Sequence, residues 1–166
     1  MAGGSFNANR SNVNGAGLYG NDATTSSISF YPQVGYFFAN NFAAGAGFQL
    51  GSYTTKGLNP INNTKYKSTI STISFEPFAR YYFFDNFYGQ TTFKVGNNRW
   101  ESDSNTGAYK NKTTNKGWSL SAGYAYMLND HVALEPQIGY GIDYYESSPN
   151  QGNLFFKIGI QVYLGK

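Results

Sequence analysis

The segment at residues 72–87 reads TISFEPFARYYFFDNF, and it repeats the segment SISFYPQVGYFFANNF at residues 27–42. Eight of the sixteen aligned positions are identical. A weaker third copy, GWSLSAGYAYMLNDHV, occupies residues 117–132, another 45 positions along the chain. Self-similarity at a fixed spacing indicates a repeated supersecondary unit.

Each copy of the repeat ends in a short polar break between two apolar runs. The breaks lie at residues 39–41, 84–86 and 129–131 and are rich in Asn and Asp. Three-residue hairpin loops commonly hold one residue at positive φ, and Asn, Asp and His are the non-glycine types enriched there. The repeat unit is therefore predicted to be a β-hairpin with a three-residue loop.

Apolar and polar residues alternate on both sides of these breaks, which indicates β-strands. In residues 69–83, Ile73 and Phe75 share one face, while Ser74 and Glu76 share the other. The alternation predicts eight strands, at residues 3–11, 24–38, 42–56, 67–83, 87–101, 116–128, 132–145 and 153–164. The longer polar connections are predicted at residues 12–23, 57–66, 102–115 and 146–152. Long strands with short turns at one end and long loops at the other are typical of an up-and-down barrel.

The composition excludes several other classes of protein. Aromatic residues make up 19% of the 166 residues and charged residues only 13%, whereas disordered chains are poor in aromatics and rich in charge. The chain has no cysteine for a disulfide or a thiolate metal site. It also has no apolar run long enough for a transmembrane helix. The net charge of +3 does not by itself argue for nucleic-acid binding. No signal peptide is recognisable at this N-terminus, and the whole chain is expected to form one domain.

One face of the predicted strands is polar, rich in small residues, and carries nearly all of the mid-strand charge. Three acids balance three bases there, which predicts an interior ion network of Glu76, Arg80, Lys94, Glu135, Asp143 and Lys157. If Phe83 pairs with Phe87 at the second turn, Glu76 lies directly across from Lys94. Such cross-strand neighbours are in contact. With eight strands the interior is filled by side chains, so we expect a plugged barrel.

The other face carries no charge in the middle of the strands and is predicted to face lipid. Large aromatic residues gather toward the strand ends, as in the girdles of transmembrane barrels. The predicted girdle consists of Tyr36, Phe38, Phe42, Tyr81, Phe83, Phe87, Trp118, Tyr126 and Tyr144. Pro32, Pro77 and Pro136 fall on this face within predicted strands, where a proline removes a ladder bond. We expect local bulges at the prolines, or N–H positions that lie beyond a shorter neighbouring strand.

The eight-strand pattern, the TISFEPFARYYFFDNF repeat and the closing strand LFFKIGIQVYL resemble the porin-family outer-membrane β-barrels of Gram-negative bacteria. In size and layout the chain is similar to the OmpA transmembrane domain and OmpX. In amino-acid sequence it is most similar to small Bacteroidetes-type barrels. The resemblance implies a bacterial outer-membrane location, with short turns on the periplasmic side and long loops outside. It implies no particular activity.

Two sets of residues are candidates for function. A basic rim at the long-loop end is predicted from Lys56, Lys65, Lys67, Arg99, Lys110, Lys112 and Lys116. Lysine and arginine suit phosphate groups, so this rim could bind lipid A, although a merely solvated surface is the alternative. The single histidine, His131, lies in a predicted turn on the other side, and no serine is placed near it for a catalytic triad. A structural role for His131 is therefore favoured over a catalytic one.

The sequence thus predicts an all-β, eight-stranded antiparallel transmembrane barrel that is not an enzyme and needs no cofactor or metal. We expect a monomer that contacts membrane lipid and lipopolysaccharide or an external protein partner, without binding nucleic acid. A narrow channel for small solutes or ions is the main alternative. A lipid-modifying outer-membrane enzyme and a soluble lipocalin-like carrier are more remote.

Overall fold

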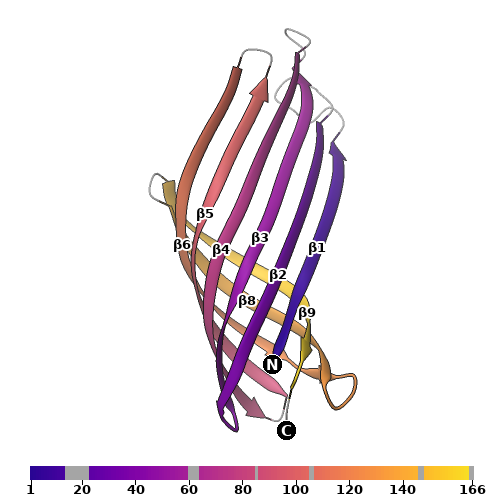
Figure 1. Cartoon of the computed structure of the whole chain (residues 1–166), viewed down its shortest axis with the longest axis vertical. Coiled ribbons are helices and arrows are strands. Elements are labelled where there is room, and N and C mark those ends of the chain that lie inside the picture. The colour runs from indigo at the N-terminus through magenta and orange to yellow at the C-terminus, as the bar shows by residue number, and fades with distance from the viewer. Residues whose placement is uncertain (14–22, 60–63, 85, 105–106, 146–147, 165–166) are drawn as a thin grey trace.

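The protein is a closed antiparallel β-barrel in the computed structural model, which describes residues 1–13, 23–59, 64–84, 86–104, 107–145 and 148–164 (Figure 1). Its strands are β1 (Ala2–Val13), β2 (Ala23–Ala39), β3 (Phe42–Asn59), β4 (Thr64–Phe84), β5 (Phe87–Ser104), β6 (Gly107–Tyr124), β7 (Tyr126–Met127), β8 (Val132–Tyr145) and β9 (Ser148–Val162). The described residues contain no helix long and apolar enough to cross a membrane.

Strands β1 to β6 pair with one another in chain order, β8 pairs with β7 and β9, and the sheet closes on itself because β1 pairs with β9 and β6 pairs with β8. Strand β7 continues β6 in the same register, since Gly123 pairs with Gln137 of β8 and Tyr126 pairs with Leu134. The described strands therefore form eight barrel strands. The predicted eight-stranded up-and-down barrel is confirmed.

The strands run further toward the long-loop end than the alternation of apolar residues predicted. Strand β6 begins at Gly107 instead of residue 116, and β9 begins at Ser148 instead of residue 153. Residues 107–114 pair with β5 in unbroken register. Because both faces of this stretch are polar, no alternation marks it. Its Tyr and Thr residues nevertheless have high strand propensity. Most of residues 12–23 lie outside the described part of the chain.

The turns at the opposite end differ slightly from three-residue loops. Ala39 pairs with Phe42 and Phe84 pairs with Phe87, and in both hairpins the register shifts at the preceding phenylalanine. In the third turn, the side-chain oxygen of Asn129 accepts hydrogen bonds from the backbone N–H groups of His131 and Val132, both at 2.9 Å. The polar breaks thus mark the hairpins correctly, and a bulge takes up one residue of the first two loops.

The three strand prolines do not cause bulges. Each leaves a gap in one of the two ladders of its strand, while the register on both sides of the gap stays the same. The gaps lie between Phe30–Leu50 and Gln33–Gly47, between Phe75–Val95 and Phe78–Thr92, and between Gly123–Gln137 and Tyr126–Leu134. Since proline has no N–H, the ladder is lost on one side only, and the other neighbour holds the strand in place.

The outer face of the barrel wall is apolar and the inner face is polar, which is the reverse of the arrangement in a water-soluble protein. Outward-facing Leu154 and Phe156 are 76% and 67% exposed, whereas inward-facing Arg80 and Gln161 are each 1% exposed. A soluble carrier would instead fill its interior with apolar side chains. The apolar outer face and polar core fit a barrel that sits in lipid.

Candidate functional site: the barrel interior and the basic outer end

A buried ion pair lies at the centre of the barrel, between side chains from opposite walls. Arg80 of β4 donates from Nη1 to both carboxylate oxygens of Glu135 on β8, at 3.1 and 2.9 Å. The exposed fractions of the two side chains are 1% and 4%. The ring of Tyr88 lies with its centroid 3.9 Å from the guanidinium carbon. This cation–π contact covers the face of the guanidinium group that its in-plane donors cannot use.

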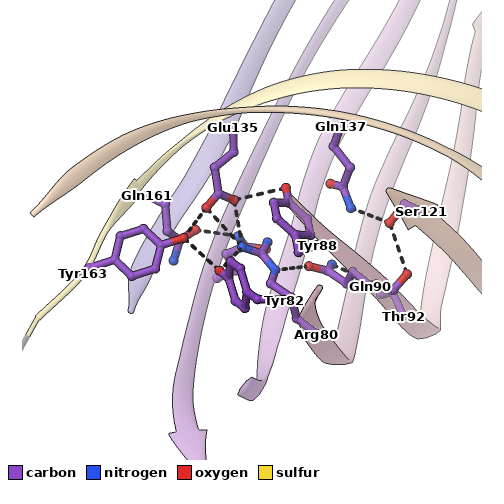
Figure 2. A network of polar contacts seen from close by, with 11 residues as sticks. Arg80, Tyr82, Tyr88, Gln90, Thr92, Ser121, Glu135, Gln137, Gln161 and Tyr163 are labelled. Carbon is purple, nitrogen blue, oxygen red and sulfur yellow. Dashed lines mark hydrogen bonds and ion pairs between the residues drawn. The ribbon is translucent and has the colours of Figure 1, made fainter. Parts of the chain in front are cut away.

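Tyrosines and glutamines complete the hydrogen bonding of this pair (Figure 2). Glu135 accepts from the hydroxyl groups of Tyr163 at 2.6 Å and Tyr88 at 3.2 Å. Arg80 donates from Nε to Gln90 at 2.9 Å and from Nη1 to Tyr82 at 3.1 Å. Buried charges are tolerated where such partners satisfy them. These residues form one cross-linked layer, which we call the plug: Arg80, Tyr82, Tyr88, Gln90, Glu135 and Tyr163.

Further polar contacts lie beside the plug and narrow the interior. Gln33 donates to Gln161 at 2.7 Å, and Gln137 donates to the hydroxyl of Ser121. A cavity of only about 20 Å³ remains between Arg80, Glu135 and these side chains, roughly the space of one water molecule. The described interior is therefore filled at this level.

The sequence prediction missed Tyr82, Tyr88, Gln90 and Tyr163 as functional partners. Tyr82 has the inward parity of Arg80, two residues before it on the same strand, and Tyr88 and Gln90 have that of Lys94. This parity was the available signal. The sequence pattern places aromatic residues in the outer girdle and, beyond parity, gives no separate signal for inward-facing tyrosines.

On the long-loop side of the plug lies a cavity of about 380 Å³, and four of the six predicted interior charges line it: Glu76, Lys94, Asp143 and Lys157. Lys94 forms an ion pair with Asp143. The register places Glu76 across from Lys94 as predicted, since Phe75 pairs with Val95 and Phe78 with Thr92, but no ion pair joins the two side chains among the described residues. Glu76 instead accepts a hydrogen bond from Ser74 at 2.9 Å. Among the described residues, the six charges thus include two close ion pairs, Arg80–Glu135 and Lys94–Asp143, while Glu76 and Lys157 form none.

On the other side of the plug, a cavity of about 950 Å³ lies at the short-turn end. Phe37, Tyr82 and Tyr163 line it, together with residues of the turns. His131 also borders this cavity, where its Nδ1 lies 3.3 Å from the backbone oxygen of Tyr163. The described contacts of His131 are thus with the turn and the end of the last strand.

The seven residues of the predicted basic rim all lie on strands β3 to β6, including Lys65, Lys110 and Lys112, which fall in predicted loops. All seven side chains are exposed. By the alternation of side chains along a strand, all seven lie on the same outward face as the apolar residues further along the same strands. Lys56 pairs directly with Lys67, and Arg99 pairs directly with Lys112. Arg99 and Lys110 lie 2.8 and 3.8 Å from Glu101. We call this set the basic belt: Lys56, Lys65, Lys67, Arg99, Lys110, Lys112 and Lys116.

The predicted aromatic girdle residues all lie exposed on the outside of the barrel. The repeat is visible in their geometry. Tyr36 and Phe38 pack edge-to-face with ring centroids 5.3 Å apart, and their counterparts 45 residues later, Tyr81 and Phe83, do the same at 5.3 Å. No group of three or more His, Cys, Asp and Glu side chains that could hold a metal ion occurs in the described part of the chain.

A family model matches residues 23–151, most of the barrel. The chain belongs to the family Protein of unknown function (DUF3575). Comparison with curated proteins finds no match for this family member.

Among solved structures, the chain is similar to the beta domain of the Bordetella autotransporter BrkA, with a TM-score of 0.50 and 16% identity. That match covers 96% of this chain and 68% of the other. It is also similar to Neisserial surface protein A (NspA), with a TM-score of 0.48, 15% identity, and coverage of 98% and 95%. At this level of identity the likeness to the autotransporter domain supports the barrel fold alone.

Proposed function

We propose that this protein is a non-enzymatic barrel of the bacterial outer membrane, of the OmpA/OmpX-like type, whose basic belt contacts the phosphates of lipopolysaccharide. The observation that carries the proposal is the direct pairing of Lys56 with Lys67 on the outward face, where neither lysine forms an ion pair with a described residue. Arg99 also pairs with Lys112, although Glu101 lies 2.8 Å from Arg99. Like charges directly opposite each other destabilise a sheet. A bound anion between them would offset this repulsion.

The position of the belt supports a membrane phosphate as that anion. The belt residues continue the outward face that carries the apolar band further down the same strands. Lys116, for example, pairs with Val95 and Tyr144, both exposed on the outside. A basic surface directly above a lipid-facing band lies at the level of the headgroups, and Arg and Lys bind phosphate through charge-assisted hydrogen bonds.

The plug supports an anchoring role over the alternative of a channel. It places buried Arg80, Glu135 and Tyr88 across the interior, and a cavity of about 20 Å³ remains there. The described contacts of His131 support a structural role for this residue, because its ring and backbone bind the turn and the last strand. We therefore favour a barrel that works through its outer surface.

Binding of refolded barrel to immobilised lipopolysaccharide tests the proposal. We expect the double substitution of Lys56→Gln with Lys67→Gln to weaken binding by about tenfold, since two phosphate contacts are lost. Arg99→Gln with Lys112→Gln should have a similar effect. Arg10→Gln removes an exposed base of β1 outside the belt and serves as the control. Lipid A stripped of its phosphates should not compete. Unchanged binding by both double variants, or equal competition by the dephosphorylated lipid, would contradict the proposal.

A further inference from the structure

Two charges in the 380 Å³ cavity form no close ion pair with any described residue. Lys94 and Asp143 neutralise each other, which leaves Glu76 and Lys157. Within the part of the chain that the structure describes, no carboxylate lies within ion-pair distance of Lys157. Its ammonium group lies only over the rings of Tyr31 and Phe155, at 5.2 and 5.6 Å from their centroids. The cavity therefore presents one cation and one anion to a ligand.

The wall beside this cavity is open between the first and last strands. Strands β1 and β9 share only the pairs Ala2–Val162, Gly3–Gln161 and Gly4–Ile160. Beyond Gly4 and before Ile160 the two strands have no ladder bonds with each other, and Figure 1 shows them running apart above the chain ends. On its other side, β1 pairs with β2 along its whole length, from Ala2 to Val13.

Residues from both edges of this open seam line the cavity. Ser5 and Asn7 of β1 line the cavity from one edge, and Asn153 and Lys157 of β9 line it from the other. Phe156 also lines the cavity, although it faces outward and is 67% exposed. Outside the seam lie the exposed apolar side chains of Phe6 and Ile158. The unpaired seam therefore lies between a charged cavity and the lipid-facing surface.

Hydrocarbon does not tolerate strand edges with unpaired backbone groups. The edges of β1 and β9 must therefore be covered by a partner with hydrogen-bonding groups that also carries an apolar part suited to the outer face. Because Glu76 is an anion and Lys157 is a cation, this partner is expected to carry both a cationic and an anionic group. A soluble zwitterion fits the charges but not the apolar flanks, and an anionic lipid offers Glu76 no cationic group.

We propose that the seam between β1 and β9 admits the headgroup of a zwitterionic, primary-amine phospholipid of the phosphoethanolamine class into the cavity. Lys157 binds its phosphate, and Glu76 accepts hydrogen bonds from its ammonium group. The phosphate oxygens also accept from polar groups of the strand edges. The acyl chains stay in the bilayer along Phe6, Phe156 and Ile158. A volume of about 380 Å³ falls within the usual range for small-molecule pockets.

Native mass spectrometry of the refolded barrel in detergent, titrated with dioleoyl-phosphatidylethanolamine, tests this site. We expect Lys157→Met and Glu76→Gln each to weaken lipid binding by about tenfold, because each removes one charge-assisted contact. Asp130→Asn, which changes an exposed carboxylate at the short-turn end, is the matched control and should bind as the parent does. Thermal midpoints confirm that the variants are folded. If Glu76→Gln does not refold, Lys157→Met decides the outcome.

Three outcomes would overturn the proposal. The first is parent-like binding of the phospholipid by folded Lys157→Met. The second is equal binding of dioleoyl-phosphatidylglycerol, which lacks the ammonium group. The third is competition by water-soluble phosphoethanolamine at the concentration of the lipid, which would place the ligand's source in the aqueous phase. The belt residues of the lipopolysaccharide proposal lie outside this cavity, so each proposal can fail without the other.

Discussion

Lys94 of β5 and Asp143 of β8 form their ion pair across Gly117 of the strand between them. Gly117 pairs with both residues, so the three lie in one row of the sheet. A side chain at this position would meet them, since a Cβ built on Gly117 would lie 2.6 Å from Asp143 Oδ1 and 3.4 Å from Lys94 Cε. The glycine therefore makes room for an interior contact between strands that are not adjacent.

We expect Gly117→Ala to lower the free energy of unfolding by about 1–3 kcal/mol, because the added methyl group overpacks the interior and displaces the carboxylate. It should also abolish the coupling between Lys94→Met and Asp143→Asn in a double-mutant cycle. Urea unfolding of the barrel in lipid or detergent provides both measurements.

Gly51→Ala is the control for this substitution. The nearest atoms to a Cβ at Gly51 lie at 3.7 Å or more, so the methyl group fits. A loss of stability as large as that of Gly117→Ala would show that the cost comes from the strand backbone and not from the ion pair.

This contact also shows why the sequence predicted the faces but not the partners. Alternation is a local property, so parity placed Lys94 and Asp143 together on the inner face without further information. Which of them meet depends on the tilt and stagger of the strands around the barrel and on the absence of a side chain at Gly117. A prediction based on adjacent strands alone assigned Lys94 to Glu76.

The strand ends show a second limit of the sequence pattern. In the middle of the barrel, lipid and core make opposite demands on the two faces, and the alternation is clear. At residues 107–114 both faces are polar, so the strand carries no such signal, and Lys110 and Lys112 were predicted to lie in a loop. Cross-strand pairing with β5 holds this stretch in strand form.

The Arg80–Glu135 pair makes a prediction about stability. Arg80→Met leaves the Glu135 carboxylate buried at 4% exposure without its cation, so we expect a loss of about 3–5 kcal/mol in the free energy of unfolding. Adding Glu135→Leu to this variant should restore part of the loss, because the orphaned charge is then removed. Urea titrations of the three variants in the same detergent measure both effects.

Two outcomes would count against this account of the plug. One is an Arg80→Met variant as stable as the parent. The other is a double variant, Arg80→Met with Glu135→Leu, whose free energy of unfolding falls below that of Arg80→Met by as much as Glu135→Leu alone would cost. The effects of substituting two residues in contact are expected to be non-additive. The second result would indicate that the tyrosines around Glu135 matter more than its cation.

The two tryptophans can report separately on the lipid-facing surface and on the polar outer end. Trp118 pairs with Phe93 and Ile142, and Phe93 is an exposed outward residue of the apolar band. Trp100 has the opposite parity to Phe93 on β5, and its indole N–H donates to Ser68 at 2.7 Å. We therefore expect brominated acyl chains to quench Trp118 strongly and Trp100 weakly.

Single-tryptophan variants separate the two signals. Trp100→Phe leaves Trp118, and Trp118→Phe leaves Trp100, in a chain that has only two tryptophans. In vesicles of brominated phosphatidylcholine, the Trp100→Phe variant should lose most of its fluorescence relative to vesicles of the unbrominated lipid. Iodide in the aqueous phase should quench the Trp118→Phe variant more. Equal quenching of both variants by bromine would place Trp100 in the hydrocarbon, which contradicts a protruding polar end above the apolar band. It would also remove the geometric reason for assigning the basic belt to the headgroup level.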